Sequence, residues 1–403
     1  MKVLIISHAY TASYNRRDKL TRLANLPNIE LGVVIPKNWY DRMQKVDRNY
    51  QEIPEDKNYQ IWPLPTFLTG RDLWYSYPTL NFHKIVCLFN PDIIHIEQEV
   101  LSQALFQIVA MNKFFWHKKL VAFFWENIDR KLNPIQAFFR WFNLRNINFA
   151  ICGNADAEKL IRKYGYKKLS KIFPQFGVDE QKFYPKDTKE LRSKLNLTGF
   201  IIGFVGRLVP EKGVKILLQA VSKLNDNFTL LVLTSMKTLK DQPCGPQGWS
   251  LQKKKRVRIM DSIPHEKFPE YMNLFDVVVL PSQTTKTWKE QFGRVMVEAM
   301  ACGVPVIGSS SGAIPEVIGD AGLIFQEKNV DDLAEKIKLL MQNEGLRKSL
   351  RKRSLQRIKQ HYTHDKIVEQ TDKVYQEIYP DATPKHDLKH DSYRVTSHPL
   401  RLL

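Results

Sequence analysis

The sequence has few cysteines and no long apolar segment. Its four cysteines, Cys87, Cys152, Cys244 and Cys302, are far apart and form no Cys-x-x-Cys pair. This spacing argues against a zinc site or a disulfide framework and fits a reducing compartment. No apolar run reaches the roughly 18 residues of a membrane span, and Ser7 ends the first one before a signal peptide could form. We therefore expect a cytoplasmic protein.

Acidic residues are scarce relative to basic ones. The chain of 403 residues has 61 Lys and Arg against 42 Asp and Glu, a net charge of +19. Such an excess indicates a polyanionic partner, which could be a nucleotide, a nucleic acid or an anionic membrane surface. Hydrophobic residues make up 43% of the chain, enough for a large core and too many for global disorder. The length suits two domains.

Strands and helices alternate along the whole chain. Apolar, β-branched runs predict strands at residues 2–7, 31–35, 91–97, 120–127, 148–152, 200–205, 228–233, 256–259, 276–280 and 304–308. Helical periodicity predicts helices at residues 15–25, 155–164, 214–223, 330–342 and 346–360. This order is typical of an α/β fold built from doubly wound parallel sheets, with ligands at the carboxyl ends of the strands.

A domain boundary is predicted near Phe183–Asp187, where turn residues and charges replace the periodic pattern. It divides the chain into a first Rossmann-like domain at residues 1–185 and a second at residues 186–364. Residues 381–403 are polar and aperiodic, so we expect a disordered tail.

Two carboxylates eight positions apart, Glu290 and Glu298, flank Gly293. The pattern predicts a loop carboxylate, a helix that carries the second one, and a turn at Gly303 into a strand. Helix N-termini bind phosphate, and a carboxylate accepts hydrogen bonds from the vicinal hydroxyls of a ribose or hexose. An ordinary amphipathic helix with two solvated glutamates is the alternative.

A second loop, Gly206–Gly213, carries Arg207 and Lys212 directly after a predicted strand. Two cations in a glycine-bounded loop can clasp a diphosphate. A solvated basic turn is the alternative.

Taken together, these segments resemble the family-four retaining glycosyltransferases, which have the two-domain GT-B fold. The resemblance rests on Glu290-x7-Glu298, the strand Gly303–Gly308, the loop Gly312–Glu316, the loop Gly206–Gly213, and Gly177–Asp179 with Phe183 and Pro185. It covers roughly residues 145–325.

The resemblance implies a hexosyltransferase-type enzyme that uses a nucleotide-diphosphate sugar as donor. It assigns catalysis to Glu290, Arg207 and Lys212, and donor binding to Glu298, Gln291, Phe292, Gly293, Arg294 and Gly206. It also implies a final helix, about residues 365–379, that crosses back to the first domain. Metal-dependent sugar transfer commonly uses Asp-x-Asp pairs. Because the chain contains none, we expect that no metal or other cofactor is required.

The acceptor side departs from the family. Many relatives have a histidine in the region of Glu126 and Asn127, and glycines in the loop after the first strand, which here contains Tyr10 and Arg16. Arg16 and Arg17 at a helix start suggest an anionic acceptor, or they form only a surface charge cluster. Glu126 could orient or deprotonate an acceptor hydroxyl, or it could cap a helix.

Further candidates on the acceptor side are His95 and Glu97, followed by Glu99, at the end of a predicted strand. We expect the acceptor to be a glycan, a lipid-linked glycan or a small molecule, in cell-surface polysaccharide or glycolipid synthesis.

Basic and aromatic residues are mixed in residues 113–119 and 135–145. Such a mixture suits an anionic bilayer interface on the cytoplasmic membrane face, or a helix docked on the sheet through its aromatics.

Two rival functions remain open. One is an epimerase or phosphorylase on the same fold, which fold alone does not exclude. The other is a basic nucleic-acid-binding protein, which predicts salt-sensitive binding. No nucleic-acid-binding motif supports the second rival, so we expect no nucleic-acid partner.

Overall fold

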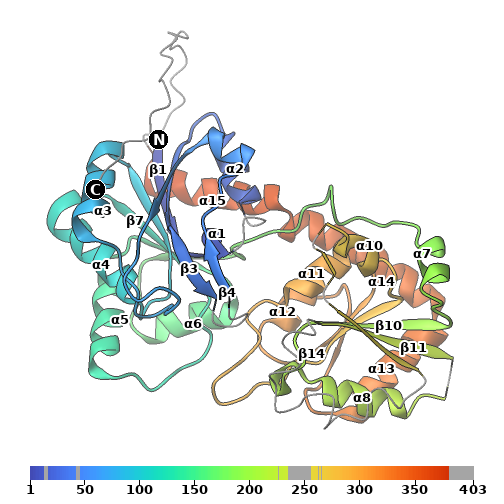
Figure 1. Ribbon diagram of the computed structural model, residues 1–403. Helices are drawn as coiled ribbons and strands as arrows, with labels where there is room; N and C mark the ends of the chain where they lie inside the picture. The colour runs from blue at the N-terminus through green and yellow to red at the C-terminus, as the bar shows by residue number, and fades with distance from the viewer. Residues whose placement is uncertain are drawn as a thin grey trace.

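The computed structural model describes residues 1–12, 17–41, 46–225, 227–234, 256–261, 263–264 and 266–380. They form two α/β domains side by side, each built on a parallel sheet with helices on its faces (Figure 1). The predicted fold class is confirmed. Arg16 and the predicted disordered tail, residues 381–403, lie outside the described residues.

The N-terminal sheet has the strand order β5-β2-β1-β6-β7-β8-β9, and its neighbouring strands are parallel. The strands are β1 (Lys2–Ser7), β2 (Glu30–Pro36), β5 (Gln60–Leu64), β6 (Ile93–Glu97), β7 (Lys119–Phe124), β8 (Phe149–Cys152) and β9 (Leu169–Ile172). A separate antiparallel hairpin is formed by β3 (Asn38–Asp41) and β4 (Val46–Asn49). The sequence missed β5 and β9, which are partly buried edge strands: β5 contains Pro63, and Ser170 and Lys171 interrupt the apolar residues of β9.

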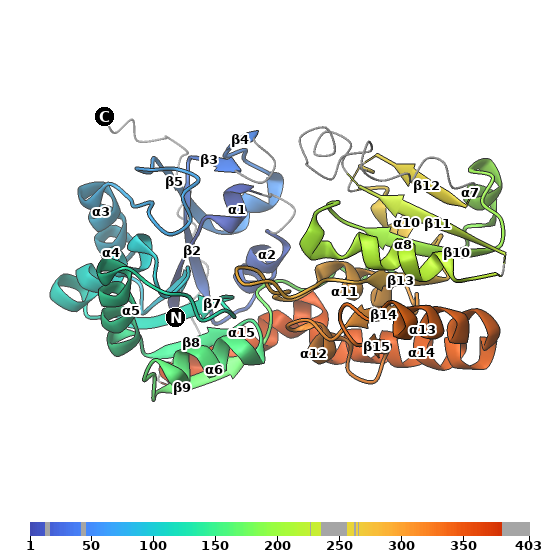
Figure 2. The same cartoon turned by 90° about the horizontal axis from the view of Figure 1, so that it is seen from below.

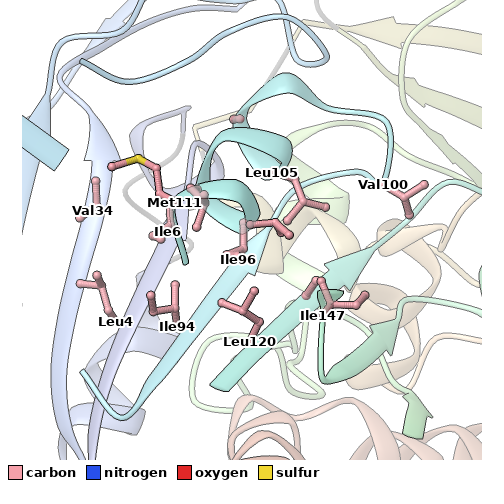
Figure 3. Close-up of a cluster of buried hydrophobic side chains, with 14 of the residues drawn as sticks. Leu4, Ile6, Val34, Ile94, Ile96, Val100, Leu105, Met111, Leu120 and Ile147 are labelled. Carbon is pink, nitrogen blue, oxygen red and sulfur yellow. The ribbon is translucent and has the colours of Figure 1, made fainter. Parts of the chain in front are cut away.

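Helices cover both faces of this sheet. They are α1 (Ala9–Ala12), α2 (Asp18–Ala24), α3 (Thr79–Phe89), α4 (Gln103–Met111), α5 (Pro134–Asn146) and α6 (Ala155–Lys163), with short turns η2 (Pro54–Asn58) and η3 (Asn112–Trp116). Figure 3 shows the core under α4, where Leu4, Ile6 and Ile96 of the strands meet Leu105 and Met111. Burying this apolar surface is the main force that holds the helices on the sheet.

The C-terminal sheet has the order β12-β11-β10-β13-β14-β15, and its neighbouring strands are also parallel. Its strands are β10 (Phe200–Val205), β11 (Phe228–Leu233), β12 (Val257–Met260), β13 (Val277–Leu280), β14 (Val306–Ser309) and β15 (Leu323–Phe325). In β10, β13 and β14 nearly every residue is buried. That explains why the sequence reads there as continuous apolar runs.

The helices of this domain are α7 (Lys189–Lys194), α8 (Val214–Ser222), α10 (Phe268–Met272), α11 (Arg294–Ala301), α12 (Ile314–Ile318), α13 (Val330–Gln342) and α14 (Glu344–Arg357). Short turns are η4 (Pro210–Lys212) and η6 (Ile358–Tyr362). Within the described residues, no helix combines the length and the apolar character that crossing a bilayer requires.

The last helix, α15 (His364–Ile378), leaves the C-terminal domain and packs on the N-terminal one (Figure 2). Its residues Ile367, Val374 and Tyr375 are fully buried in the core behind β1 and β6. The chain therefore crosses between the domains twice, once before β10 and once before α15.

The two crossings touch each other. Val178 N donates to Tyr362 O at 2.7 Å, and His364 N donates to Val178 O at 3.3 Å. A Cβ on Gly177 would lie 2.4 Å from His364 N and 2.5 Å from the Thr363 carbonyl carbon. Glycine is therefore required at position 177 for the two backbones to approach so closely.

We predict that Gly177→Ala destabilises the protein by about 1–3 kcal/mol, the usual effect of overpacking a rigid contact. Chemical denaturation measures the change. The control is Gly345→Ala near the start of α14, where a Cβ would meet its nearest neighbour at an ordinary 3.5 Å. Equal stability of wild type and Gly177→Ala would contradict this account of the crossing.

Candidate active site

The carboxyl ends of β10, β13 and β14 carry the loops that contain the predicted donor residues. Arg207 follows β10, Ser282 follows β13, and Gly312 follows β14. Because these strands are adjacent and parallel, their loops meet at one edge of the sheet, where open α/β folds bind ligands.

Glu290 and Lys212, predicted separately from two loops, form an ion pair. Lys212 Nζ lies 2.7 Å from Glu290 Oε2, and Ser282 Oγ donates to the same oxygen at 2.9 Å. Both charged side chains are largely buried, with exposed fractions of 18% and 9%. The ring of Trp288 packs against the lysine, with Nζ 4.8 Å from its centroid. Lys212 and Glu290 therefore compensate each other's charge within the site.

Arg207, the second predicted cation, is partly buried and has no hydrogen bond or ion pair within the part of the chain that the structure describes. It follows Gly206, whose φ of 149° favours glycine. An unpaired guanidinium at the carboxyl edge of a buried strand is available to an anionic ligand.

Backbone packing fixes the loops around Glu290. A Cβ on Gly213 would lie 1.7 Å from Pro281 O, and one on Gly312 would lie 2.1 Å from Glu290 O. Both glycines have positive φ angles, 68° and 57°. Ala313 N also donates to Glu290 O at 3.0 Å. These glycines allow the three loops to lie against one another without side chains between them.

The second carboxylate, Glu298, lies on α11, which starts after Gly293 in a left-handed conformation with φ 75°. Glu298 is buried, and its Oε1 is 2.8 Å from Nε of Arg294. Burial raises the pKa of Glu298, and Arg294 opposes that shift. Phe292, Arg294 and Glu298 line one small cavity with Asp18, Asp179 and His364, at the place where the two crossings meet.

On the N-terminal domain, Glu126 and Asn127 follow β7 and face the loop before α11. Asn127 Nδ2 donates to Glu290 O at 3.0 Å. Glu126 accepts two hydrogen bonds of 3.2 Å from Nε of Arg130, whose Nη2 donates to Thr287 O at 3.2 Å. The structure thus brings Glu126 and Asn127 to this loop, residues 287–292, the donor loop. The next described helix, α5, begins only at Pro134, too far along the chain for Glu126 to cap it.

Three other acceptor-side candidates, Tyr10, His95 and Glu97, lie inside the N-terminal domain. Tyr10 and His95 have no exposed surface, and Glu97 is 4% exposed. His95 Nδ1 lies 2.6 Å from the hydroxyl of Tyr375 on α15. These assignments are therefore corrected: the side chains belong to a polar cluster inside the N-terminal domain, which leaves them no surface for an acceptor.

Lys19 supplies the positive charge that allows the Glu97 carboxylate of this cluster to be buried. Its Nζ lies 2.8 Å from Glu97 Oε1, which also accepts from the Tyr10 hydroxyl at 3.1 Å, while Gln175 Nε2 donates to Oε2 at 2.7 Å. Burial would raise the pKa of Glu97, but Lys19 foremost outweighs it and brings the pKa to about 2. A buried carboxylate with this many partners is a structural group. The sequence could not reveal Lys19, because a lysine in a short helix usually lies in solvent.

The sequence is similar to those of known glycosyltransferases. Residues 185–357 match the family model described as glycosyl transferases group 1. The chain is 31% identical over 242 residues to the capsular polysaccharide biosynthesis glycosyltransferase CapM of Staphylococcus aureus, covering 58% of this chain and 60% of that protein. The chain spans about half the length of the curated relatives it matches, with 47%, 60% and 57% of the first three covered.

Solved structures match over nearly the whole chain. Sucrose-phosphate synthase from Thermosynechococcus elongatus superimposes with a TM-score of 0.73 at 19% identity, covering 94% of this chain and 99% of that one. HepE of Anabaena, in complex with UDP and glucose, gives a TM-score of 0.68 at 17% identity, covering 94% and 100%. At such identities the likeness shows the fold alone, the GT-B arrangement of two Rossmann-like domains.

Glu99, which follows the acceptor-side candidates His95 and Glu97 in the sequence, lies in the loop after β6. It is partly buried, and its two oxygens accept hydrogen bonds of 3.0 Å from the backbone N–H groups of Trp125 and Glu126. Burial first, and then the neighbouring Glu126 carboxylate, raise the pKa of Glu99 to about 7, although the two N–H donors oppose them.

This shift predicts a pH dependence of stability. A carboxyl whose pKa is raised on folding stabilises the native state at low pH, and that contribution disappears as pH rises through the folded value of about 7. We expect the unfolding free energy of wild type to fall relative to Glu99→Gln between about pH 5 and pH 8. Glu335→Gln, exposed on α13, is the control. If the unfolding free energies of wild type and Glu99→Gln change in parallel with pH, the raised pKa of Glu99 is contradicted.

Proposed function

Because residues 185–357 match the family model of the group 1 glycosyl transferases, we propose that the protein transfers a sugar from a nucleotide-diphosphate sugar to an acceptor hydroxyl. The observation that carries the proposal is the buried Glu290–Lys212 pair at 2.7 Å. Lys212 shares its loop with Arg207, and both cations lie at the strand edge where a phosphorylated ligand is expected.

The proposed roles follow from charge. Arg207 and Lys212 neutralise the leaving diphosphate, and electrostatic stabilisation of this kind usually contributes most to the rate enhancement in such sites. When Lys212 pairs with the diphosphate, the Glu290 carboxylate is no longer in its ion pair. It can then accept hydrogen bonds from the sugar hydroxyls. Glu298 accepts from the ribose. The backbone at Gln291–Gly293 and the start of α11 supply N–H groups, and Gly206 leaves space beside Arg207.

We propose further that transfer retains the anomeric configuration and requires no metal. Retention rests on the family resemblance and is tested by the configuration of the product. Metal independence rests on Arg207 and Lys212, which supply the positive charge that a divalent cation would otherwise bring to the diphosphate.

Glu126 is the best-placed group for an acceptor hydroxyl, because it lies on the N-terminal domain beside the donor loop. Its ion pair with Arg130 favours orienting the hydroxyl over removing its proton. The similarity to CapM, a capsular polysaccharide biosynthesis glycosyltransferase, supports a glycan or lipid-linked acceptor in polysaccharide synthesis.

Substitution of the paired residues tests the proposal. A thermal-shift screen of nucleotide sugars first identifies the donor, because a ligand of the native state raises its stability. We expect Glu290→Ala and Lys212→Ala each to lower turnover roughly 10²–10³-fold, and Glu298→Ala to raise the KM for the donor. EDTA should leave wild-type turnover unchanged.

The control for these variants is Glu335→Ala, at an exposed position on α13. Full transfer activity in both Glu290→Ala and Lys212→Ala would overturn the site assignment. Donor epimerisation without any transfer product would overturn the proposed reaction.

We also propose that the N-terminal domain binds an anionic membrane surface through α3, η3 and α5. These helices pack on one face of the sheet (Figure 1) and expose a set of large apolar side chains: Leu80, Leu88, Phe114, Phe115, Ile135, Phe138 and Trp141. In α5, Phe139 and Leu144 are buried, whereas Phe138 and Trp141 are about half exposed. Docking on the sheet therefore uses only part of the aromatic set.

Cations accompany this apolar surface. Arg145 lies over the Trp141 ring at 4.9 Å and Arg140 over the Tyr164 ring at 3.6 Å. Apolar side chains next to basic groups are typical of proteins that lie at the headgroup level of anionic bilayers. Such a position would bring the cleft close to a lipid-linked acceptor.

Vesicle sedimentation tests this surface. Each cation near an anionic bilayer contributes about 1 kcal/mol, so we expect Arg140→Glu with Arg145→Glu to weaken binding to phosphatidylglycerol vesicles at least roughly 30-fold. Lys348→Glu with Lys352→Glu on α14 is the control with the same charge change. Equal sedimentation of wild type and the Arg140/Arg145 variant would contradict the proposal.

A further inference from the structure

The loop before α11 reaches from the C-terminal domain to the N-terminal one (Figure 2). This donor loop, residues 287–292, contains Glu290 and Gln291. Among its residues, Thr287 O accepts from Arg130 at 3.2 Å, and Lys289 forms an ion pair with Asp156 at 2.5 Å. Two residues of the donor loop are therefore held by side chains of the opposite domain.

Two asparagines make the central contacts. Asn127 Nδ2 donates to Glu290 O at 3.0 Å, and Asn154 Nδ2 donates to Gln291 O at 2.9 Å. Both asparagines are buried, with exposed fractions of 7% and 1%. The Trp125 ring, 5.7 Å from that of Phe292, covers the next residue. Consecutive backbone carbonyls of the donor loop thus each receive one amide from the N-terminal domain.

The orientation of Asn154 is fixed by its second role. Its Oδ1 accepts from Ala157 N at 2.8 Å and so caps the start of α6. Because the oxygen is engaged in the cap, the amide nitrogen points to Gln291 O. The C-terminal domain also contacts this helix start directly, since Glu316 Oε2 accepts from Ala155 N at 2.9 Å. The carboxylate is well placed against the partial positive charge of a helix N-terminus.

Both the backbone carbonyl and the side-chain carboxylate of Glu290 are held by other residues. Its carbonyl oxygen accepts from Asn127 of one domain and from Ala313 N of the other. Its carboxylate lies on Lys212 and Ser282. If the backbone of the donor loop shifts, the carboxylate shifts with it, and displacements of about 1 Å in such groups can cost 10²-fold in rate.

We propose that Asn127 and Asn154 are positioning residues that act through the donor loop. They hold its backbone so that Glu290 meets the sugar of the donor, and they do so only while the two domains are in contact. The donor site is thus completed by the acceptor domain. The contact between Glu290 and the sugar rests on the proposed function. The positioning of the donor loop rests only on the hydrogen bonds described above.

Asparagine-to-aspartate substitutions test the loop without removing bulk. In Asn154→Asp the carboxylate still caps α6, because aspartate is as good an N-cap as asparagine. Only the donor to Gln291 O is lost, and a carboxylate now faces a carbonyl. Asn127→Asp makes the same change at Glu290 O. The matched control is Asn146→Asp, because Asn146 Nδ2 donates to Phe142 O at 2.7 Å within α5, away from the junction.

The first measurement is hydrogen–deuterium exchange of the full chain without ligand. We expect peptides that span residues 287–292 to exchange at least roughly 10-fold faster in Asn127→Asp and Asn154→Asp, and unchanged in Asn146→Asp, because exchange reports local opening. Unchanged exchange in both junction variants overturns the proposal. This result depends on no substrate, so it stands apart from the proposed function.

The second measurement separates positioning from damage to the fold. With UDP and UDP-glucose as probes, we expect UDP affinity to stay within about 2-fold, since its contacts come from the C-terminal domain, while kcat with UDP-glucose falls roughly 10–100-fold. Equal losses of UDP affinity and kcat would indicate a merely structural role and overturn the positioning role. If wild type itself transfers sugar from no nucleotide donor, the proposed function fails, and the exchange result still decides whether the loop is held.

Discussion

The architecture depends on one close approach between two backbones. Gly177 allows the chain entering the C-terminal domain to lie against the chain returning to the N-terminal domain, with Val178 bonded to Tyr362 and His364. Both links between the domains therefore pass through one point. The cavity that holds Glu298 lies at this point, so part of the candidate donor site is built where the two crossings meet.

The two domains bury their charge pairs in two different ways. In the N-terminal domain, Lys19 and Glu97 are fully buried together, with Tyr10 and Gln175 completing the hydrogen bonds. That pair is closed to ligands and specifies how α2 sits on the sheet. In the C-terminal domain, Lys212 and Glu290 are paired but retain some exposure, and Arg207 has no partner among the described residues. Only the second arrangement can exchange partners with an incoming anion.

The sequence predicted strands and loops correctly where the pattern within one segment is sufficient to define them. Continuous apolar runs predicted β10, β13 and β14, and glycines beside charges predicted the loops at Arg207 and Glu290. It failed where the deciding partner is remote. His95 looks like a strand-end ligand until Tyr375, 280 residues away, is placed beside it. The pairing of Lys212 with Glu290 spans 78 residues, and the asparagine contacts join different domains, so no local pattern could show them.

The docking of α15 also constrains how the chain can be made. Ile367, Val374 and Tyr375 fill the core behind β1 and β6, so the N-terminal sheet lacks part of its apolar cover until residue 378 has left the ribosome. The C-terminal domain has its sheet and helices complete about twenty residues earlier, at Arg357. Domains usually fold in the order of synthesis. Here the half that is synthesised first is completed last, and its unfinished core is exposed for as long as the second half takes to appear.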